Sequence, residues 1–411
     1  MNVSRARQLV TAIYQAGIAA VHGEQCVARH LADRPPGGPV SVIALGKAAS
    51  AMATGAVRAL ASQLQRGYLV TRDGHTDPDL NSDQRFTCVA AGHPVPDQRS
   101  LDAGAGLLRF IAATPAGETL LLLISGGTSS LVEVLKPGVS LDNLSGLNRW
   151  LLASGLDIGA MNQVRAAVSE IKAGGLDNAL AGHQALVLLI SDVPGVDPAV
   201  IGSGLLISPA RDRHLPAGLP DWLEALLATA ATQPSATLEP LQPIEHRVIA
   251  TLDDALQAAA RYAEAQGLAV TRIDNQLQGD AVAAGQQIAT FLQQQAPGIY
   301  LWGGETTVCL PDQPGQGGRN QSLALAAAVE LAGRDEIVLL AAGTDGSDGP
   351  GRYAGALVDG NTFARGSARL DAAEALRSAD AGSFLDASGD LLTTGPTGTN
   401  VMDMVVAMKT A

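Results

Sequence analysis

The chain has few of the residues on which several classes of protein depend. Its 411 residues include only three cysteines, Cys26, Cys88 and Cys309, and aromatic residues make up 3% of the composition. Three scattered cysteines favour a reducing cytoplasm over a disulfide framework or a zinc site. The formal net charge of -13 argues against a nucleic-acid partner, which requires a basic face. No apolar run reaches membrane-spanning length, so we expect no membrane partner either.

Short apolar runs alternate with helical segments along the chain. The runs do not alternate polar with apolar residues, which indicates strands that are buried on both faces, as in parallel sheets. The five runs are residues 40–45, 119–124, 185–190, 299–302 and 337–342. The clearest helical segments are residues 48–63, 252–266, 280–295 and 321–331. This order predicts an α/β fold with mostly parallel sheets and with ligands at the carboxyl ends of the strands.

A proline-rich stretch at residues 208–243 predicts a domain boundary. It separates two α/β halves, and the second half restarts with an apolar run at residues 246–250. We therefore expect an N-terminal Rossmann-like domain over residues 1–235 and a C-terminal α/β domain over residues 244–411. A cleft between two such domains is a common place for a small-molecule site, and we expect the active site there.

Lysine is rare, with four lysines against 23 arginines. Lys47 lies between the run at residues 40–45 and a predicted helix. An ammonium at that position can reach a phosphate held over the helix N-terminus. A solvated lysine at a helix start is the alternative, but the rarity and the position of Lys47 favour a functional role.

A glycine- and hydroxyl-rich turn follows the run at residues 119–124. Two glycines and several hydroxyls at a helix start can form an oxyanion cradle, although an ordinary helix cap has the same composition. The candidate phosphate- or substrate-binding residues of this turn are Ser125, Gly126, Gly127, Thr128 and Ser129. The turn is not a Walker A loop, because the Gly-Lys-Ser/Thr ending is missing.

Three carboxylates come directly after predicted strands. Asp192 could accept a proton from a substrate hydroxyl or help to hold Mg²⁺. Glu305 and Asp345 lie in glycine-rich turns and could serve as ligands of a hard cation. For Asp192 and Asp345, an ordinary turn stabilised by the carboxylate is the structural alternative.

Two further segments carry groups that suit phosphate. Arg319 and Asn320 open an alanine-rich helix after a glycine pair, where backbone N–H groups favour anions and a guanidinium can clamp a phosphate. Thr397 and Asn400 lie in a glycine- and hydroxyl-rich loop near the C-terminus. This loop could close over phosphates, or it could be a simple turn.

Read in order, the motifs resemble the signature of class II glycerate 2-kinases. The motifs are Ala-Leu-Gly-Lys-Ala-Ala, His-Pro-Val-Pro-Asp, Ser-Gly-Gly-Thr-Ser, Ser-Asp-Val-Pro-Gly, Gly-Gly-Glu-Thr-Thr-Val, Gly-Gly-Arg-Asn-Gln, Gly-Thr-Asp-Gly and Thr-Gly-Pro-Thr-Gly-Thr-Asn-Val. They extend from Gly46 to Val401. The family pairs an N-terminal glycerate-kinase domain with a C-terminal domain called MOFRL.

The resemblance implies transfer of the ATP γ-phosphoryl group to the 2-hydroxyl of D-glycerate, or of a related small hydroxy acid, with Mg²⁺. It also implies that Lys47 and Arg319 are active-site groups. Within that frame, Asp192 is our candidate to orient or deprotonate the substrate hydroxyl, and Glu305 and Asp345 are our candidates around the metal. A homodimer is possible.

The chain departs from the family pattern at several places, including Ala173 after Lys172 and Arg211 where an aspartate is expected. Where the family has a basic pair after Arg165, this chain has Ala166 and Ala167. Leu205 and Leu206 replace a Pro-Thr pair, and Gly351 and Arg352 replace a threonine and an acidic residue. We expect these changes to alter the acceptor that the site takes.

Two other functions are open. Members of this family have been labelled hydroxypyruvate reductases, but none of the five runs is followed by the Gly-x-Gly-x-x-Gly pattern of a dinucleotide site. A non-catalytic nucleotide- or anion-binding homologue is the second alternative, and the missing basic pair after Arg165 favours it.

Overall fold

The chain folds into two compact units in a computed structural model. The structure describes residues 2–411 apart from residues 155, 157, 181, 208–214, 217 and 232–243. Residues 23–249 form one unit, which we call the continuous unit. Residues 1–22 and 250–411 form the other, which we call the split unit. Much of the proline-rich stretch expected at the boundary lies outside the described residues.

A six-stranded sheet forms the centre of the continuous unit, in the order β3-β2-β1-β4-β5-β6. The β3–β2, β2–β1, β1–β4 and β4–β5 pairs are parallel. The strands are β1 (Val40–Leu45), β2 (Leu64–Arg72), β3 (Phe86–Ala91), β4 (Thr119–Ile124), β5 (Gln184–Ile190) and β6 (Glu245–Ala250). Every residue of β1 and β4 is buried, which confirms the prediction of parallel strands covered on both faces.

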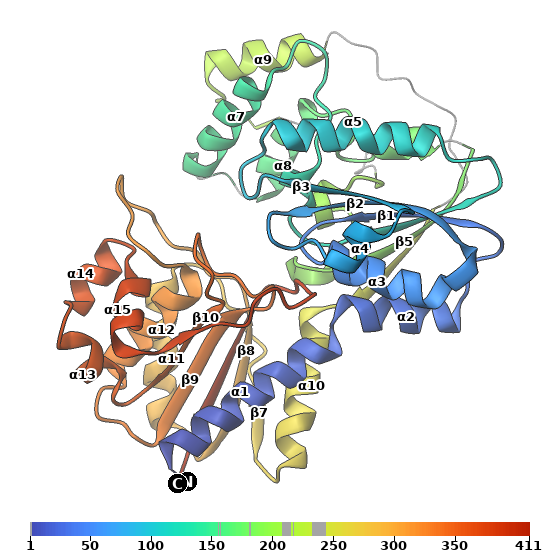
Figure 1. Ribbon diagram of the computed structural model, residues 1–411. Coiled ribbons are helices and arrows are strands. Elements are labelled where there is room, and N and C mark those ends of the chain that lie inside the picture. The colour runs from blue at the N-terminus through green and yellow to red at the C-terminus, as the bar shows by residue number, and fades with distance from the viewer. Residues whose placement is uncertain are drawn as a thin grey trace. The chain divides into compact units, whose positions relative to one another are not determined.

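Helices cover both faces of this sheet (Figure 1). On one face, Leu107 of α5 packs in a core with Ile43 of β1 and Leu122 of β4. On the other, α3 contacts β1 and β2, and α2 packs against α3. The helices of this unit are α2 (Gly23–Asp33), α3 (Ala49–Leu60), α4 (Pro78–Ser82), α5 (Gln98–Ala112), α6 (Thr128–Leu131), α7 (Leu141–Ala153), α8 (Ile158–Ala167) and α9 (Asp221–Ala231).

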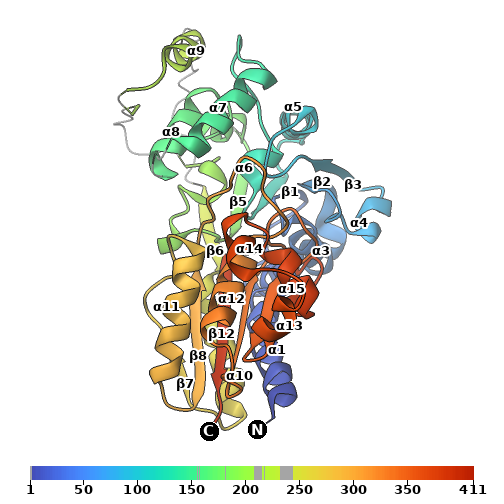
Figure 2. The same cartoon turned by 90° about the vertical axis from the view of Figure 1, so that its left-hand side faces the viewer.

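The split unit contains a second six-stranded sheet, in the order β11-β10-β9-β12-β8-β7. Its strands are β7 (Val270–Arg272), β8 (Gly298–Gly304), β9 (Ile337–Gly343), β10 (Gly355–Asp359), β11 (Leu391–Leu392) and β12 (Asp403–Lys409). Helices α1 (Val3–Ala20) and α10 (Leu252–Ala265) lie on one face, and α11 (Ala281–Gln294) and α12 (Arg319–Glu330) lie on the other (Figures 1 and 2). Three short helices complete the unit: α13 (Thr362–Ser367), α14 (Ala372–Arg377) and α15 (Ala381–Ser388).

The α/β class is confirmed, but the strand directions of the split unit differ from the expectation of mostly parallel sheets. Only the β7–β8 pair is parallel, because β12 lies between β8 and β9 and runs antiparallel to both, while β10 and β11 also pair antiparallel. Burial on both faces gives a strand its apolar run whichever way its neighbours run. The apolar composition of these strands therefore could not reveal whether neighbouring strands run parallel or antiparallel.

The division of the chain also differs from the expected ranges of 1–235 and 244–411. Helix α1 belongs to the split unit, where a Cβ on Gly17 would lie 2.9 Å from the Ala255 carbonyl oxygen of α10. The run at residues 246–250, expected to start the second domain, forms β6 at the edge of the first sheet. Within the described part of the chain, no helix is both long and apolar enough to span a bilayer.

Candidate active site

Two turns of the continuous unit lie side by side because β1 and β4 are neighbouring parallel strands. The turn after β1 contains Lys47, whose backbone N–H donates to the Gly126 carbonyl oxygen at 2.9 Å. The next N–H, of Ala48, donates to Ser125 Oγ at 3.0 Å. The rare lysine and the Ser-Gly-Gly turn, 78 residues further on, therefore form one local structure.

Glycine is required at two points of this structure. Gly46 has a φ of +116°, and a Cβ there would lie 2.3 Å from Ser125 Oγ. Gly127 has a φ of +87°, and its Cβ would lie 3.1 Å from both Lys47 Cγ and His93 Nε2. Positive φ makes a side chain strained at both positions, and the contact with Ser125 Oγ also leaves no room for one at Gly46. Gly127, Lys47 and His93 are thus neighbours, although sequence reasoning left His93 out of the site.

The hydroxyls of the Ser-Gly-Gly-Thr-Ser turn do not all have the same role. Ser125 and Thr128 are fully buried, and Thr128 Oγ1 donates to the Ser125 carbonyl oxygen at 2.7 Å. These two side chains hold the shape of the turn. Ser129 is half-buried and accepts a hydrogen bond from Ser203 Oγ at 2.8 Å, and it lines a cavity.

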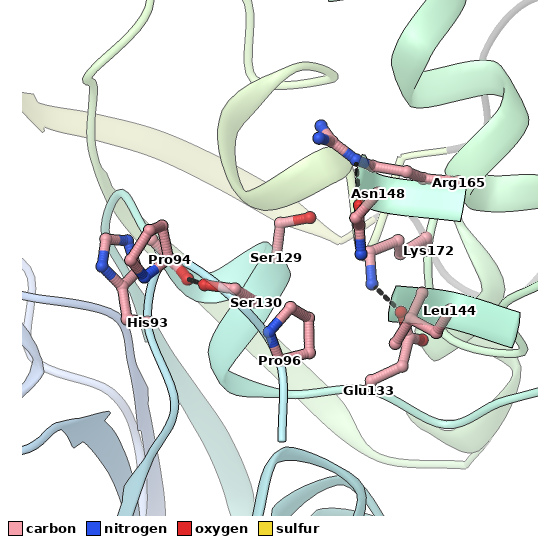
Figure 3. A pocket seen from close by; sticks show the side chains of 11 residues that line it. His93, Pro94, Pro96, Ser129, Ser130, Glu133, Leu144, Asn148, Arg165 and Lys172 are labelled. Carbon is pink, nitrogen blue, oxygen red and sulfur yellow. Dashed lines mark hydrogen bonds and ion pairs between the residues drawn. The ribbon is translucent and has the colours of Figure 1, made fainter. Parts of the chain in front are cut away.

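This cavity has a volume of about 170 Å³ (Figure 3). Its polar lining residues are His93, Ser129, Ser130, Glu133, Asn148, Arg165 and Lys172. Lys172 forms an ion pair with Glu133, and each side chain is 1% exposed. Ser169 Oγ also donates to Glu133 Oε1 at 2.6 Å. Of these residues, sequence reasoning had named only Ser129 as a candidate.

Asp192 follows β5, as expected, and is half-buried. It does not appear among the described residues that line the cavity. Its assignment as the group that orients or deprotonates a hydroxyl stays a prediction.

In the split unit, Arg319 is the first residue of α12 and is held by two carboxylates. Arg319 Nε and Nη2 donate to the two oxygens of Asp403 at 2.6 and 2.9 Å, and Nη1 lies 2.7 Å from Glu305 Oε1. Burial acts to lower the pKa of Arg319, but the charges of Asp403 and Glu305 outweigh it and raise the pKa. Sequence reasoning missed Asp403, which begins β12.

Asn320 points into the protein instead of lying open to a phosphate. It is buried, and its backbone N–H and Nδ2 donate to Asp348 Oδ1 at 3.0 and 3.3 Å. The Gln321 backbone N–H donates to Asp348 Oδ2 at 2.8 Å. Burial raises the pKa of Asp348 to about 6, against the effect of these hydrogen bonds. Asp348 thus caps the start of α12 from a distant turn.

A second pair of loops brings Asp345, Thr397 and Asn400 into one region. Thr397 Oγ1 donates to the Thr344 carbonyl oxygen. The Val401 backbone N–H donates to Thr344 Oγ1 at 2.8 Å. Asn400, the residue before Val401, is buried. Asp345 Oδ1 accepts hydrogen bonds from the backbone N–H and Oγ of Ser347, both at 2.9 Å.

Asp345 lies close to Asp403 as well. A Cβ on Gly343 would lie 3.3 Å from Asp345 Oδ1 and 3.5 Å from Asp403 Oδ1. Burial, followed by the charges of Asp345 and Asp403, raises the pKa of Tyr14, whose hydroxyl donates to the Gly343 carbonyl oxygen at 2.8 Å. No group of three His, Cys, Asp or Glu side chains in the described part of the chain is arranged to hold a metal. Two carboxylates nevertheless suit Mg²⁺, which commonly takes its other ligands from phosphates and water.

The residues that replace the family pattern lie in different surroundings. Leu205 and Leu206 are buried in the core of the continuous unit, and Ala166 is buried as well. Arg352 lies in the split unit, with its guanidinium 5.4 Å from the centre of the Tyr353 ring. The two leucines therefore act on packing, and none of these residues lines the cavity in the described part of the continuous unit.

The fold defines an α/β protein built from two units, and the paired turns place a lysine beside a glycine-rich turn at neighbouring strand ends. Comparison with known proteins agrees with this. A family described as "Domain of unknown function (DUF4147)" matches residues 9–216, and the MOFRL family matches residues 298–403. The chain belongs to the class II glycerate 2-kinase family, which joins these two regions, and the resemblance of the motifs is confirmed.

Three relatives illustrate this membership. The chain is 34% identical over 386 residues to a D-glycerate 2-kinase of Thermotoga maritima, covering 90% of each chain. It is 36% identical over 421 residues to an Agrobacterium vitis protein provisionally named a hydroxypyruvate reductase, covering 98% of this chain and 94% of the other. A crystal structure of a T. maritima glycerate kinase matches 99% of this chain and 100% of its own, with a TM-score of 0.81 and 31% identity.

Proposed function

We propose that this protein transfers the γ-phosphoryl group of ATP to the 2-hydroxyl of D-glycerate, giving 2-phosphoglycerate. Glycerate kinases 30–34% identical over most of the chain support the proposal. The observation that carries it is the hydrogen bond from the Lys47 N–H to Gly126, which holds a lysine against a glycine-rich turn at neighbouring strand ends. Ligands of α/β sheets bind at that edge.

Phosphoryl transfer depends mainly on positioning and on offsetting negative charge. In this proposal, the Lys47 ammonium and the Arg319 guanidinium stabilise the charge that develops on the transferred group. Glu305 and Asp403 hold the Arg319 fork in one orientation. Asp192 accepts the proton of the attacking 2-hydroxyl.

Asp345 would hold Mg²⁺ together with oxygens of the nucleotide, with Glu305 as the second candidate ligand. Glu305 also pairs with Arg319, so its carboxylate helps to orient the guanidinium as well. When bound, Mg²⁺ would supply charge neutralisation on the phosphates. A cytoplasmic location and a homodimer stay predictions.

The name of the A. vitis relative raises the reductase alternative. Its support is weak, because β1, β4, β5, β8 and β9 are not followed by Gly-x-Gly-x-x-Gly. The non-catalytic alternative differs from the kinase in one measurable respect, the release of ADP.

The test is ADP release from Mg-ATP with D-glycerate, L-glycerate, glycolate and lactate as acceptors. Turnover with D-glycerate supports the proposal. Turnover with another acid alone would replace the acceptor and keep the kinase. If the protein binds ATP but releases no ADP with any of these acids, the result would favour the non-catalytic binding protein. Oxidation of NADH by hydroxypyruvate would favour the reductase.

A further inference from the structure

The cavity lined by Ser129 and Arg165 contains one positive charge that no carboxylate of the described residues neutralises. Lys172 and Glu133 neutralise each other as a buried ion pair. Arg165, on α8, donates from Nε to Asn148 Oδ1 at 3.0 Å and from Nη1 to Asn162 Oδ1 at 3.4 Å. Both acceptors are neutral amides, and Arg165 forms no ion pair with a carboxylate of the described residues.

This arrangement is unusual for a guanidinium that is partly removed from water. Burial lowers the pKa of Arg165, and no nearby acid offsets that effect. Buried charges are normally paired, because an isolated charge loses its hydration without compensation. The Nη2 group, which could donate two N–H bonds, has no acceptor among the described residues, so the fork keeps donors available for an anion.

The size and the lining of the cavity indicate which anion would fit. A volume of about 170 Å³ is below the roughly 300–1,000 Å³ of pockets that enclose drug-sized ligands. It suits a small acid better than a nucleotide. Ser129 and Ser130 offer hydroxyls, and Leu144 and Pro96 offer apolar contacts, on the same lining as Arg165 (Figure 3).

The helix around Arg165 adds to this argument. The next two residues, Ala166 and Ala167, carry no charge, and Ala166 is buried. Arg165 is therefore the only cation of the described α8 residues. A charged contact from the described residues of this helix to an anion would therefore come from Arg165.

We propose that Arg165 binds the carboxylate of the acceptor acid, as a forked pair of N–H···O bonds with the Nη2 side of the guanidinium. The identity of the ligand as an acceptor rests on the proposed kinase function, whereas the carboxylate site itself does not. Asn148 and Asn162 orient the fork, and Ser129 and Ser130 contact the hydroxyls of the acid. The site thus selects small hydroxy acids over the corresponding neutral molecules.

The test compares D-glycerate with its neutral amide, D-glyceramide, in wild type, Arg165→Gln and Arg149→Gln. Arg149 is an exposed arginine of α7 that does not line the cavity, so it is the matched control. Calorimetry measures the binding of each compound, and steady-state kinetics measures KM and kcat. Thermal unfolding checks that each variant is folded.

We expect Arg165→Gln to weaken glycerate binding and raise its KM by ~10- to 100-fold, the size of a lost charge-assisted bond. The KM for ATP stays close to that of wild type. The wild-type preference for acid over amide disappears in Arg165→Gln and persists in Arg149→Gln.

Unchanged glycerate affinity in Arg165→Gln would overturn the inference, and so would a retained preference for acid over amide. If the protein still released ADP normally, the kinase function would stand without the Arg165 site. Conversely, a wild-type protein that releases no ADP but binds small acids through Arg165 would overturn the kinase and support the site. Equal loss in both arginine variants would show a general effect of charge and overturn the assignment to Arg165.

Discussion

The two units differ in the charge that their candidate residues gather. In the continuous unit, Lys172 is neutralised by Glu133, and among the described residues Arg165 bonds to amide oxygens alone, so the cavity keeps a positive charge. In the split unit, one arginine meets several acids. Arg319 pairs with Glu305 and Asp403, and the charge of Asp348 also acts on it.

This difference indicates a division of roles between the units. A cationic cavity suits an anionic acceptor, whereas closely spaced carboxylates suit a divalent cation. The chain as a whole has a net charge of -13, so composition alone would suggest poor affinity for anions. Local pairing decides the sign of each site, because interactions between buried charges depend on their immediate partners.

The largest expected effect tests the neutralised pair of the continuous unit. Lys172→Met leaves the buried Glu133 without its partner and should destabilise this unit by about 3–5 kcal/mol. Chemical denaturation, followed by a probe in each unit, measures the loss. The split unit should unfold with little change.

The double variant Glu133→Gln/Lys172→Met is the control for that experiment. The amide keeps an acceptor for Ser169 and removes the uncompensated charge, so most of the lost stability should return. A Lys172→Met protein as stable as wild type would show that the ion pair does not matter to the continuous unit.

A smaller effect concerns pH and the acid-rich split unit. The pKa of Asp348 is raised from 3.8 to about 6, so the folded protein holds this proton more tightly than the unfolded chain. The resulting stabilisation is complete below about pH 4 and is lost as pH rises through about 6, for a total of about 3 kcal/mol at most.

Asp348→Asn removes this titration. The unfolding free energy of wild type minus that of the variant should therefore fall between pH 4 and pH 6.5. Denaturant unfolding at pH 4, 5 and 6.5 measures the difference. A difference that stays constant, or that grows with pH, would contradict the raised pKa.

The third prediction compares the proposed charge-stabilising side chains of the two units, Lys47 and Arg319. Lys47→Ala and Arg319→Ala should each lower turnover by ~100-fold or more, about 2.7 kcal/mol, the scale of one lost transition-state partner. Arg319→Ala should also lower the melting temperature of the split unit, because Asp403, whose side chain is 3% exposed, loses its partner.

Two further variants separate these effects. Arg319→Lys keeps the positive charge but loses the forked geometry, so it should recover stability more than turnover. Arg334→Ala removes an arginine with a side chain 53% exposed and should change neither. Near-wild-type turnover in both Lys47→Ala and Arg319→Ala would remove these residues from the active site.

Much of the fold could be predicted because strong burial leaves a strong pattern. The runs at residues 40–45 and 119–124 coincide with β1 and β4, where every residue is buried. The start of α12 was less predictable. It begins at Arg319, after the glycine pair as expected, but its cap could not be predicted, because Asp348 accepts the N–H groups of Asn320 and Gln321 from 28 and 27 residues away.

The candidate site was only partly predictable, because some of its residues acquire their role from partners that are distant in sequence. Lys47, Ser129 and Arg319 stand out because their types and spacing suit phosphate chemistry. Asp403 and Glu133 do not, since each acquires its role from a partner distant in sequence. Arg319 and Asp403 are 84 residues apart, and Lys172 and Glu133 are 39 residues apart.

The sequence by itself determined the α/β class, the family, and the candidate lysine and arginine of the site. Local burial patterns and ordered motifs indicate each of them. Tertiary structure alone decided the antiparallel insertion of β12, the transfer of α1 to the split unit and the pairing of each buried charge. Strand direction and charge pairing depend on which distant segments meet, and no local property of the chain encodes that meeting. Arg165 became a candidate only when its neighbours proved to be amides.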